Sequence, residues 1–364
     1  MSLNIPDRNA GVATGQDQVW GFNKNTGIDS RQYFAPGSKI FCADPNNPQA
    51  TDAGNLGQDP TVPLATIAAA VTLCRDHMGD TIIVGANDWW QYAPQTHRPT
   101  PIAETITIPE GKGGIRIVGA STNPLGVAWS TQTASDVAIT VHAVDVLIEG
   151  FCFYPDAANC IGILTEWVGA ANFGENLTVR RCFFESGLDY GIQLDYSWYC
   201  YIYDNYFDGV NVAAIHNLNV EGDPDYLSVT NNVFNGCAIA VNLGTTRGTI
   251  IENNKIVSCP TGISMNGGLT CTVTNNVINT TVGSGVVAID AAGNSECVIH
   301  GNVINGDPAG ANNFIDLTGG SDNIVSDNWL ACTIAQYDTT CSDATSGAWV
   351  NNHCTDGDTV LPPT

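Results

Sequence analysis

Two carboxylates are the first candidates for chemistry in this sequence. Glu166 and Asp195 each follow a short apolar stretch, and aligning the two stretches places the carboxylates at equivalent positions. If the stretches are neighbouring parallel strands, outward side chains at equivalent positions lie about 5 Å apart. Two carboxylates at that distance have the geometry of a retaining glycosidase. They would also shift each other's pKa values apart, as the roles of acid and nucleophile require.

His216 belongs to the same candidate site, because the alignment that pairs the carboxylates places it level with Gln193. We therefore group it with Glu166 and Asp195 as the catalytic set of an enzymatic interpretation. The simpler interpretation is ordinary surface acidity, or a cation that bridges the carboxylates. The sequence favours this simpler interpretation and predicts no catalytic residue.

Aromatic residues gather just after Asp195 and are candidates for binding. Side chains alternate along a strand, so several of them must point outward. Exposed Tyr and Trp side chains are typical of protein interfaces, and sugar rings can stack on them. We expect a subunit interface, with sugar binding as the alternative, formed by Tyr196, Trp198, Tyr199 and Tyr201.

Two further aromatic groups lie nearer the N-terminus. Trp89, Trp90 and Tyr92 lie in a loop between early strands, which we interpret as an interface or a hydrophobic lid rather than a ligand-binding loop. Residues 1–40 are polar and rich in Gly, with isolated aromatics that include Trp20 and Phe22. Such a segment cannot bury enough apolar surface to fold alone. Such an arm is either disordered or docks onto a neighbouring protein, and its scattered aromatics favour docking.

The elements that position these residues are repeats of one short pattern: an apolar residue, two polar residues, Asn, then two bulky residues. The pattern recurs six times between residues 202 and 330, after two weaker copies at 148–153 and 179–184. Self-similarity at a period of 20–50 residues indicates a solenoid. The apolar residues alternate, so the unit contains strands. The sequence predicts an all-β, right-handed parallel β-helix in which each coil contributes two or three strands.

The fourth position of the pattern is expected to form a ladder of stacked asparagines. Amide side chains that lie above one another can hydrogen-bond from coil to coil. Asn also tolerates the left-handed backbone that a tight corner requires. We therefore assign a structural role to Asn205, Asn232, Asn254, Asn276, Asn302 and Asn328.

Five of the 13 cysteines follow the same register, and we interpret such cysteines as buried filler. Cys200, Cys271 and Cys297 each precede the first apolar position by two residues, while Cys237 and Cys259 each follow the ladder Asn by five. Stacked neighbours would be close enough to bridge if oxidised. The first residues lack the charged and apolar regions of a signal peptide, so we expect free thiols.

The ends of a solenoid must be capped to prevent pairing with other chains. Residues 63–78 have apolar residues at helical spacing, and we expect this helix to lie across the first coil. The β-helix then covers residues 41–330. Residues 331–364 lose the repeat and are interpreted as an irregular cap and tail.

Charge and composition limit the partners. The formal net charge is −24, so nucleic acid and anionic membranes are poor partners. The acidic surface would keep the protein soluble. No stretch is apolar and long enough to cross a membrane, and no metal or cofactor is expected from the spacing of Cys and His.

The segment from Pro63 to Val84, followed by coils with Asn at their turns, resembles the pectin-lyase-like right-handed β-helix superfamily. That resemblance implies the fold over about residues 40–330. The superfamily includes polysaccharide lyases, polygalacturonases, phage tailspikes and non-catalytic virion proteins. The Gly-His-Gly and Arg-Ile-Lys motifs of its polygalacturonase-like members do not occur here. The general character is closest to the non-catalytic β-helical proteins of bacteriophages.

Three functional hypotheses follow. The first is a structural virion protein without enzymatic activity, assembled in the host cytoplasm as a homotrimer and attached to a partner such as a major capsid protein. The second is an enzyme or tailspike that degrades or binds polysaccharide. The third is a subunit of an extracellular filament.

Overall fold

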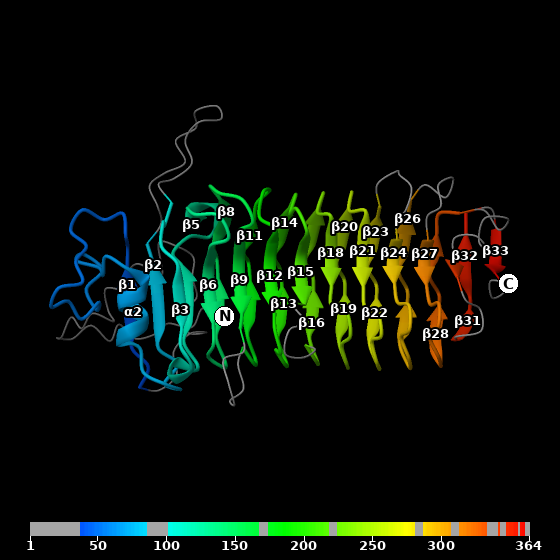
Figure 1. The fold of residues 1–364 in the computed structure, drawn as a ribbon, viewed down its shortest axis with the longest axis horizontal. Coiled ribbons are helices and arrows are strands. Elements are labelled where there is room, and N and C mark those ends of the chain that lie inside the picture. The colour runs from blue at the N-terminus through cyan, green and yellow to red at the C-terminus, as the bar shows by residue number, and fades with distance from the viewer. Residues whose placement is uncertain are drawn as a thin grey trace, which may run out of the picture.

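The repeats stack into one elongated β-helix in the computed structural model, with α2 near one end and the C-terminus at the other (Figure 1). The structure describes residues 37–85, 101–166, 174–217, 224–280, 287–306, 313–332, 341–342, 347–355 and 357–360. Strands in these segments form three sheets of 12, 11 and 10 strands, here called sheets A, B and C. A typical coil gives one strand to each sheet, as predicted.

Each sheet runs the length of the rod. Sheet A contains β1 (Ile40–Ala43), β2 (Thr81–Val84), β4 (Arg116–Gly119), β7 (Leu147–Glu149), β10 (Thr178–Arg180), β13 (Tyr201–Tyr203), β16 (Ser228–Thr230), β19 (Ile250–Glu252), β22 (Thr272–Thr274), β25 (Val298–His300), β28 (Asn323–Ser326) and β31 (Gly347–Val350). Sheet B contains β5 (Ala128–Thr131), β8 (Cys152–Pro155), β11 (Phe183–Phe184), β14 (Tyr206–Asp208), β17 (Val233–Asn235), β20 (Lys255–Val257), β23 (Val277–Asn279), β26 (Val303–Asn305), β29 (Trp329–Leu330), β32 (Asn352–Cys354) and β33 (Gly357–Val360). Sheet C contains β3 (Ile106–Ile108), β6 (Val137–Val141), β9 (Ile161–Thr165), β12 (Tyr190–Leu194), β15 (Ala213–Asn217), β18 (Ile239–Asn242), β21 (Thr261–Ser264), β24 (Val287–Asp290), β27 (Asn313–Asp316) and β30 (Cys341–Ser342).

The core consists of columns of equivalent residues from successive coils. In sheet B, the rings of Phe184, Phe207 and Phe234 stack with centroids 4.6 and 4.9 Å apart. The column continues through Ile256 and Ile278, which are also fully buried. β-branched and aromatic side chains suit such half-buried pleated surfaces, which explains why the repeat selects them.

The corner between sheets A and B is the ladder of asparagines. Oδ1 of Asn254 accepts hydrogen bonds from the backbone N–H and the side-chain amide of Asn232, at 2.9 and 3.1 Å. The amide of Asn254 donates in turn to the Val229 carbonyl and to Asn276, at 2.8 and 3.0 Å. One side chain therefore bonds the coil before it and the coil after it.

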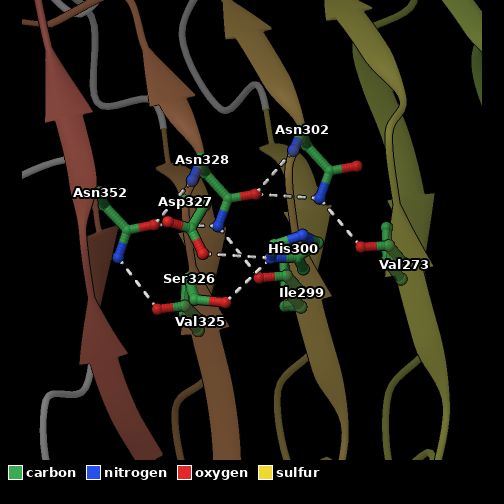
Figure 2. A network of polar contacts seen from close by, with 9 residues as sticks. All are labelled: Val273, Ile299, His300, Asn302, Val325, Ser326, Asp327, Asn328 and Asn352. Carbon is green, nitrogen blue, oxygen red and sulfur yellow. Dashed lines mark hydrogen bonds and ion pairs between the residues drawn. The ribbon is translucent and has the colours of Figure 1, made fainter.

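The same bonding continues to the C-terminal end of the rod. Figure 2 shows Asn302, Asn328 and Asn352 in file, each amide reaching a backbone carbonyl of the preceding coil. Asn352 lies beyond residue 330, and β31 and β32 pair in parallel with β28 and β29. The regular coils thus extend past residue 330, and β33 then pairs antiparallel with β32.

The backbone at this corner differs from the expectation in one respect. The left-handed residue is the one before each ladder Asn, as at Asn231 and Asn253, both with φ of 56°. The ladder Asn instead has its side chain buried and its amide hydrogen-bonded, which is a different reason for its recurrence. The tight turn and the ladder are separate requirements on adjacent positions.

The helix at the N-terminal end, α2 (Ile67–Leu73), is shorter than the predicted 63–78. Thr66 caps it, since its Oγ1 accepts from the Ala69 N–H at 3.1 Å. It ends at Leu73, since Cys74 has an extended backbone with ψ of 146°, and the next N–H, that of Arg75, donates to Asp80 at 2.8 Å. Its buried residues pack against β1, β2 and β3, so it covers the first coils as expected.

Candidate functional site

A hollow in the outer face of sheet A is a candidate site. Arg116, Leu147, Thr178 and Tyr201 occupy one register position on four successive strands. An open hollow of about 600 Å³ lies along this column. The long side chains of Arg116 and Tyr201 are at its two ends, and the short side chain of Thr178 lies between them. Strands about 4.8 Å apart place its ends about 14 Å from each other.

Polar residues form the two sides of the hollow. On one side Asn176 donates to Asp145 at 2.9 Å, and both residues have the left-handed backbone of the turn that precedes sheet A. On the other side lie Arg180 and Tyr203, which are in register on β10 and β13. The lining therefore offers guanidinium, amide, carboxylate and phenol groups around a small floor.

Buried Glu149 fixes the position of Arg180. Its Oε2 accepts from Nε and Nη2 of Arg180 at 3.0 and 2.8 Å, and it also pairs with Arg181. Arg180 donates from Nη1 to the Tyr203 hydroxyl at 2.8 Å. Hydrogen bonds between charged groups are the strong ones, so this guanidinium is held in place at the edge of the hollow.

Three exposed tyrosines, here called the tyrosine patch, adjoin the hollow. Tyr199, Tyr201 and Tyr226 are 45, 49 and 50 % exposed. Tyr199 and Tyr226 occupy equivalent left-handed turn positions and stack with ring centroids 5.1 Å apart at 9°. The ring of Tyr226 also lies over Gly248, where an added Cβ would be 2.6 Å from it.

The other predicted aromatics are placed differently. Tyr196 and Trp198 are half-buried and tilt against each other at 5.2 Å, so they support the turn rather than extend the patch. Trp20, Phe22, Trp89, Trp90 and Tyr92 lie outside the described residues. Among the described members of the predicted interface set, Tyr199 and Tyr201 are exposed.

The two candidate carboxylates follow neighbouring strands of sheet C. The register of β9 and β12, which pairs Leu164 with Gln193, extends to Glu166 and Asp195. Their surroundings differ, because Glu166 is exposed and Asp195 is only 3 % exposed. Glu166 contacts the imidazole of His142, which sequence reasoning had not selected, with 3.2 Å between Oε2 and Nε2. The expectation of two outward carboxylates therefore holds for Glu166 alone.

His216 is level with Gln193, as the alignment predicted. Its ring stacks on Tyr190 with centroids 4.7 Å apart. Burial lowers the pKa of His216 below its usual value, and its Nδ1 has no hydrogen-bond partner among the described residues. Its surroundings thus favour the neutral imidazole.

Sequence reasoning missed Arg116, Glu149, Arg180 and Tyr226 as site residues. Coil lengths vary, so the sequence alone did not show that these residues face one another across coils. In the described part of the chain, no three His, Cys, Asp or Glu side chains are arranged to hold a metal ion. No helix among the described residues is long and apolar enough to span a membrane.

Comparison with known proteins supports the fold. Residues 168–330 match the family model described as a right handed beta helix region. DFA-IIIase from Arthrobacter chlorophenolicus A6, without its lid, is 13% identical with a TM-score of 0.53, over 88% of this chain and 92% of that one. The Dettilon tailspike protein is 15% identical with a TM-score of 0.48, over 80% and 62%. Among curated proteins no sequence matches this chain. The predicted right-handed parallel β-helix is confirmed.

Proposed function

We propose, on the premise that this chain is a right-handed parallel β-helix, that it is a structural protein on the surface of a virus particle. The observation that carries the proposal is the tyrosine patch beside the arginine-lined hollow on sheet A. Tyr and Arg are enriched at the centres of protein interfaces. The stacked coils form a rigid support, and the patch is the surface through which the protein attaches.

The partner in this proposal is another virion protein, such as a major capsid protein, with homotrimers of the chain as the attached unit. The arm of residues 1–40, with Trp20 and Phe22, would add a second contact. A net charge of −24 disfavours random association between particles that display the protein. Two attachment points and a charged outer surface together suit a decoration or fibre role.

The proposal is tested first by mass spectrometry of purified particles from the host that carries the gene. The chain should be a stoichiometric component, and its absence from all particles would rule the proposal out.

Next, Tyr199→Ala with Tyr201→Ala should reduce incorporation about tenfold or more, since each central interface tyrosine contributes over about 1 kcal/mol. Val277→Ala with Val303→Ala, exposed on sheet B, is the matched control and should leave incorporation unchanged.

A second candidate function is cleavage of a polysaccharide. The pairing of Glu166 with His142, with Asp195 one coil away, supports it. Incubation with surface polysaccharides should then release reducing ends, and Glu166→Gln should abolish the release while Glu252→Gln leaves it intact.

A third candidate, an extracellular filament subunit, requires that the purified protein polymerise alone.

A further inference from the structure

Thirteen cysteines are all buried, and six of them lie in three pairs that join adjacent coils. The pairs are Cys237 with Cys259, Cys271 with Cys297, and Cys332 with Cys354. The two cysteines of each pair are 22 or 26 residues apart in sequence and lie in adjacent coils. The inference drawn from them does not depend on the proposed function.

The register of the strands places the first two pairs side by side. Thr272 pairs with Val298, so the preceding Cys271 and Cys297 are level, and the Cys271 N–H donates to the Cys297 sulfur at 3.3 Å. Asn235 pairs with Val257, and two residues further along the chain Cys237 and Cys259 occupy the same turn of adjacent coils.

The third pair lies at the C-terminal end of the rod. The sulfurs of Cys332 and Cys354 are 3.3 Å apart. Both thiols are buried under the last coils. Local opening is easiest at the end of a stacked array, so this pair would be the first that a reagent reaches.

We propose that these three pairs are oxidation sites that form disulfide bridges between successive coils. In the first two pairs the cysteines are level in adjacent coils, about 4.8 Å apart, and a disulfide needs Cα atoms about 4.4–6.8 Å apart. Cys354 is level with Leu330 rather than with Cys332, so the third pair is argued from the 3.3 Å between its two sulfurs. The bridges therefore form without a change of fold. They tie the C-terminal half of the rod together at three levels, while the N-terminal half stays unbridged.

The reaction is thiol–disulfide exchange with a low-molecular-weight disulfide such as oxidised glutathione. One cysteine thiolate of the pair attacks the reagent and displaces a glutathione thiolate. The partner thiolate then displaces the second glutathione and closes the bridge. Two protein thiols lose two electrons and two protons, and one oxidised glutathione becomes two reduced molecules.

Other buried cysteines provide internal controls. Cys200 is level with Leu177 and Leu227, and Cys182 lies in the ladder column next to Asn205. Neither has a level cysteine to bridge.

The experiment is cysteine mapping on the full chain, refolded from urea in oxidised or reduced glutathione, then alkylated, digested and analysed by mass spectrometry. With oxidised glutathione we expect three linked peptide pairs, 237–259, 271–297 and 332–354, and alkylated Cys182 and Cys200. Any bridge that includes Cys182 or Cys200, or alkylation of all cysteines after equilibration in oxidised glutathione, would overturn the proposal.

A variant separates specific pairing from general oxidation. Cys297→Ser should lose only the 271–297 bridge, leave Cys271 alkylated and keep the other two bridges. A new bridge between Cys271 and Cys200 would contradict the fixed register. In the unaltered chain a reductant should lower the thermal unfolding midpoint of the oxidised protein, and the shift should be smaller in Cys297→Ser.

Discussion

The side-chain amide of Asn232 donates to Oδ1 of Asn254 on the next coil at 3.1 Å, and both residues are buried. The same oxygen also accepts the backbone N–H of Asn232. Removal of one ladder side chain thus leaves buried donors unsatisfied in the preceding coil and a buried acceptor with fewer bonds in the next. Because the polar groups depend on one another, the stability of the rod depends strongly on this column.

Asn254→Ala should reduce the free energy of unfolding by about 3 kcal/mol or more, since each buried polar group left without a partner costs about 1–3 kcal/mol. Urea-induced unfolding followed by circular dichroism measures the change. Asn279→Ala is the matched control, because that side chain is exposed on the next coil, and it should cost under about 0.5 kcal/mol. Equal losses in the two variants would show that the ladder bonds contribute little.

The sequence was sufficient for this part of the fold because the ladder repeats one residue type at one position. Two details could not be obtained from it. The pattern shows that the corner is tight but not which residue makes the turn. In the structure the left-handed residue is the one before Asn254. Asn352 escaped notice because apolar Val350 occupies the second position of its copy, and His353 and Cys354 follow it instead of a bulky apolar pair.

The candidate site was less accessible to sequence reasoning, because it depends on which residues face each other across coils of unequal length. Tyr199 and Tyr201 were identified from their local density alone. Tyr226 is 27 residues away and joins the patch only because its turn is equivalent to that of Tyr199. Asp195 was expected outside and is buried, since alternation along a strand does not extend past the strand's last residue into the corner.

Gly248→Ala should disturb the tyrosine patch although it replaces no tyrosine. Its Cβ would be 2.6 and 2.8 Å from two ring carbons of Tyr226, and φ at Gly248 is +58°. We expect a loss of about 1–3 kcal/mol from backbone strain and a displaced ring. Near-ultraviolet circular dichroism and urea unfolding measure the two effects.

The matched comparison for Gly248→Ala uses Tyr226→Ala as the background. With the ring removed, only the backbone strain remains, so Gly248→Ala should reduce the free energy of unfolding by less in that background. The difference between the two losses measures the steric clash between the new methyl group and the Tyr226 ring. If Gly248→Ala costs the same in both backgrounds, Tyr226 does not rest on Gly248 in solution.

Acid should weaken the N-terminal end of the rod through Asp80. Burial raises the pKa of this carboxyl. Hydrogen bonds from the Arg75 side chain and from the N–H groups of Lys39 and Arg75 lower the pKa by more, so that the pKa of Asp80 lies below its usual value. A pKa lowered by folding gives stability that is present above the unfolded value of about 3.9 and is lost as pH falls through the folded value. The loss should therefore appear below about pH 4.

Asp80→Asn tests this assignment. It should lower the thermal midpoint at neutral pH, because the amide oxygen cannot replace a carboxylate that binds a guanidinium and two backbone N–H groups. It should also flatten the decline of the midpoint between pH 4 and 2. Asp76→Asn, on the exposed turn nearby, should change both properties less, because its amide oxygen can still accept from the Gly113 N–H. An identical acid decline in Asp80→Asn would exclude Asp80 as its source.

Glu149→Gln should loosen the arginine side of the hollow. The carboxylate is fully buried and pairs with Arg180 and Arg181, so its neutral replacement leaves two guanidinium groups facing an amide. Breaking a buried pair typically costs about 3–5 kcal/mol, and the exposure of Arg181 reduces that figure here to about 2–3 kcal/mol. Glu252→Gln is the control, because Glu252 occupies the same register column further along sheet A with its side chain half-exposed. If the hollow takes part in attachment, Glu149→Gln should also lower incorporation into particles at a temperature where the variant remains folded, whereas Glu252→Gln should not.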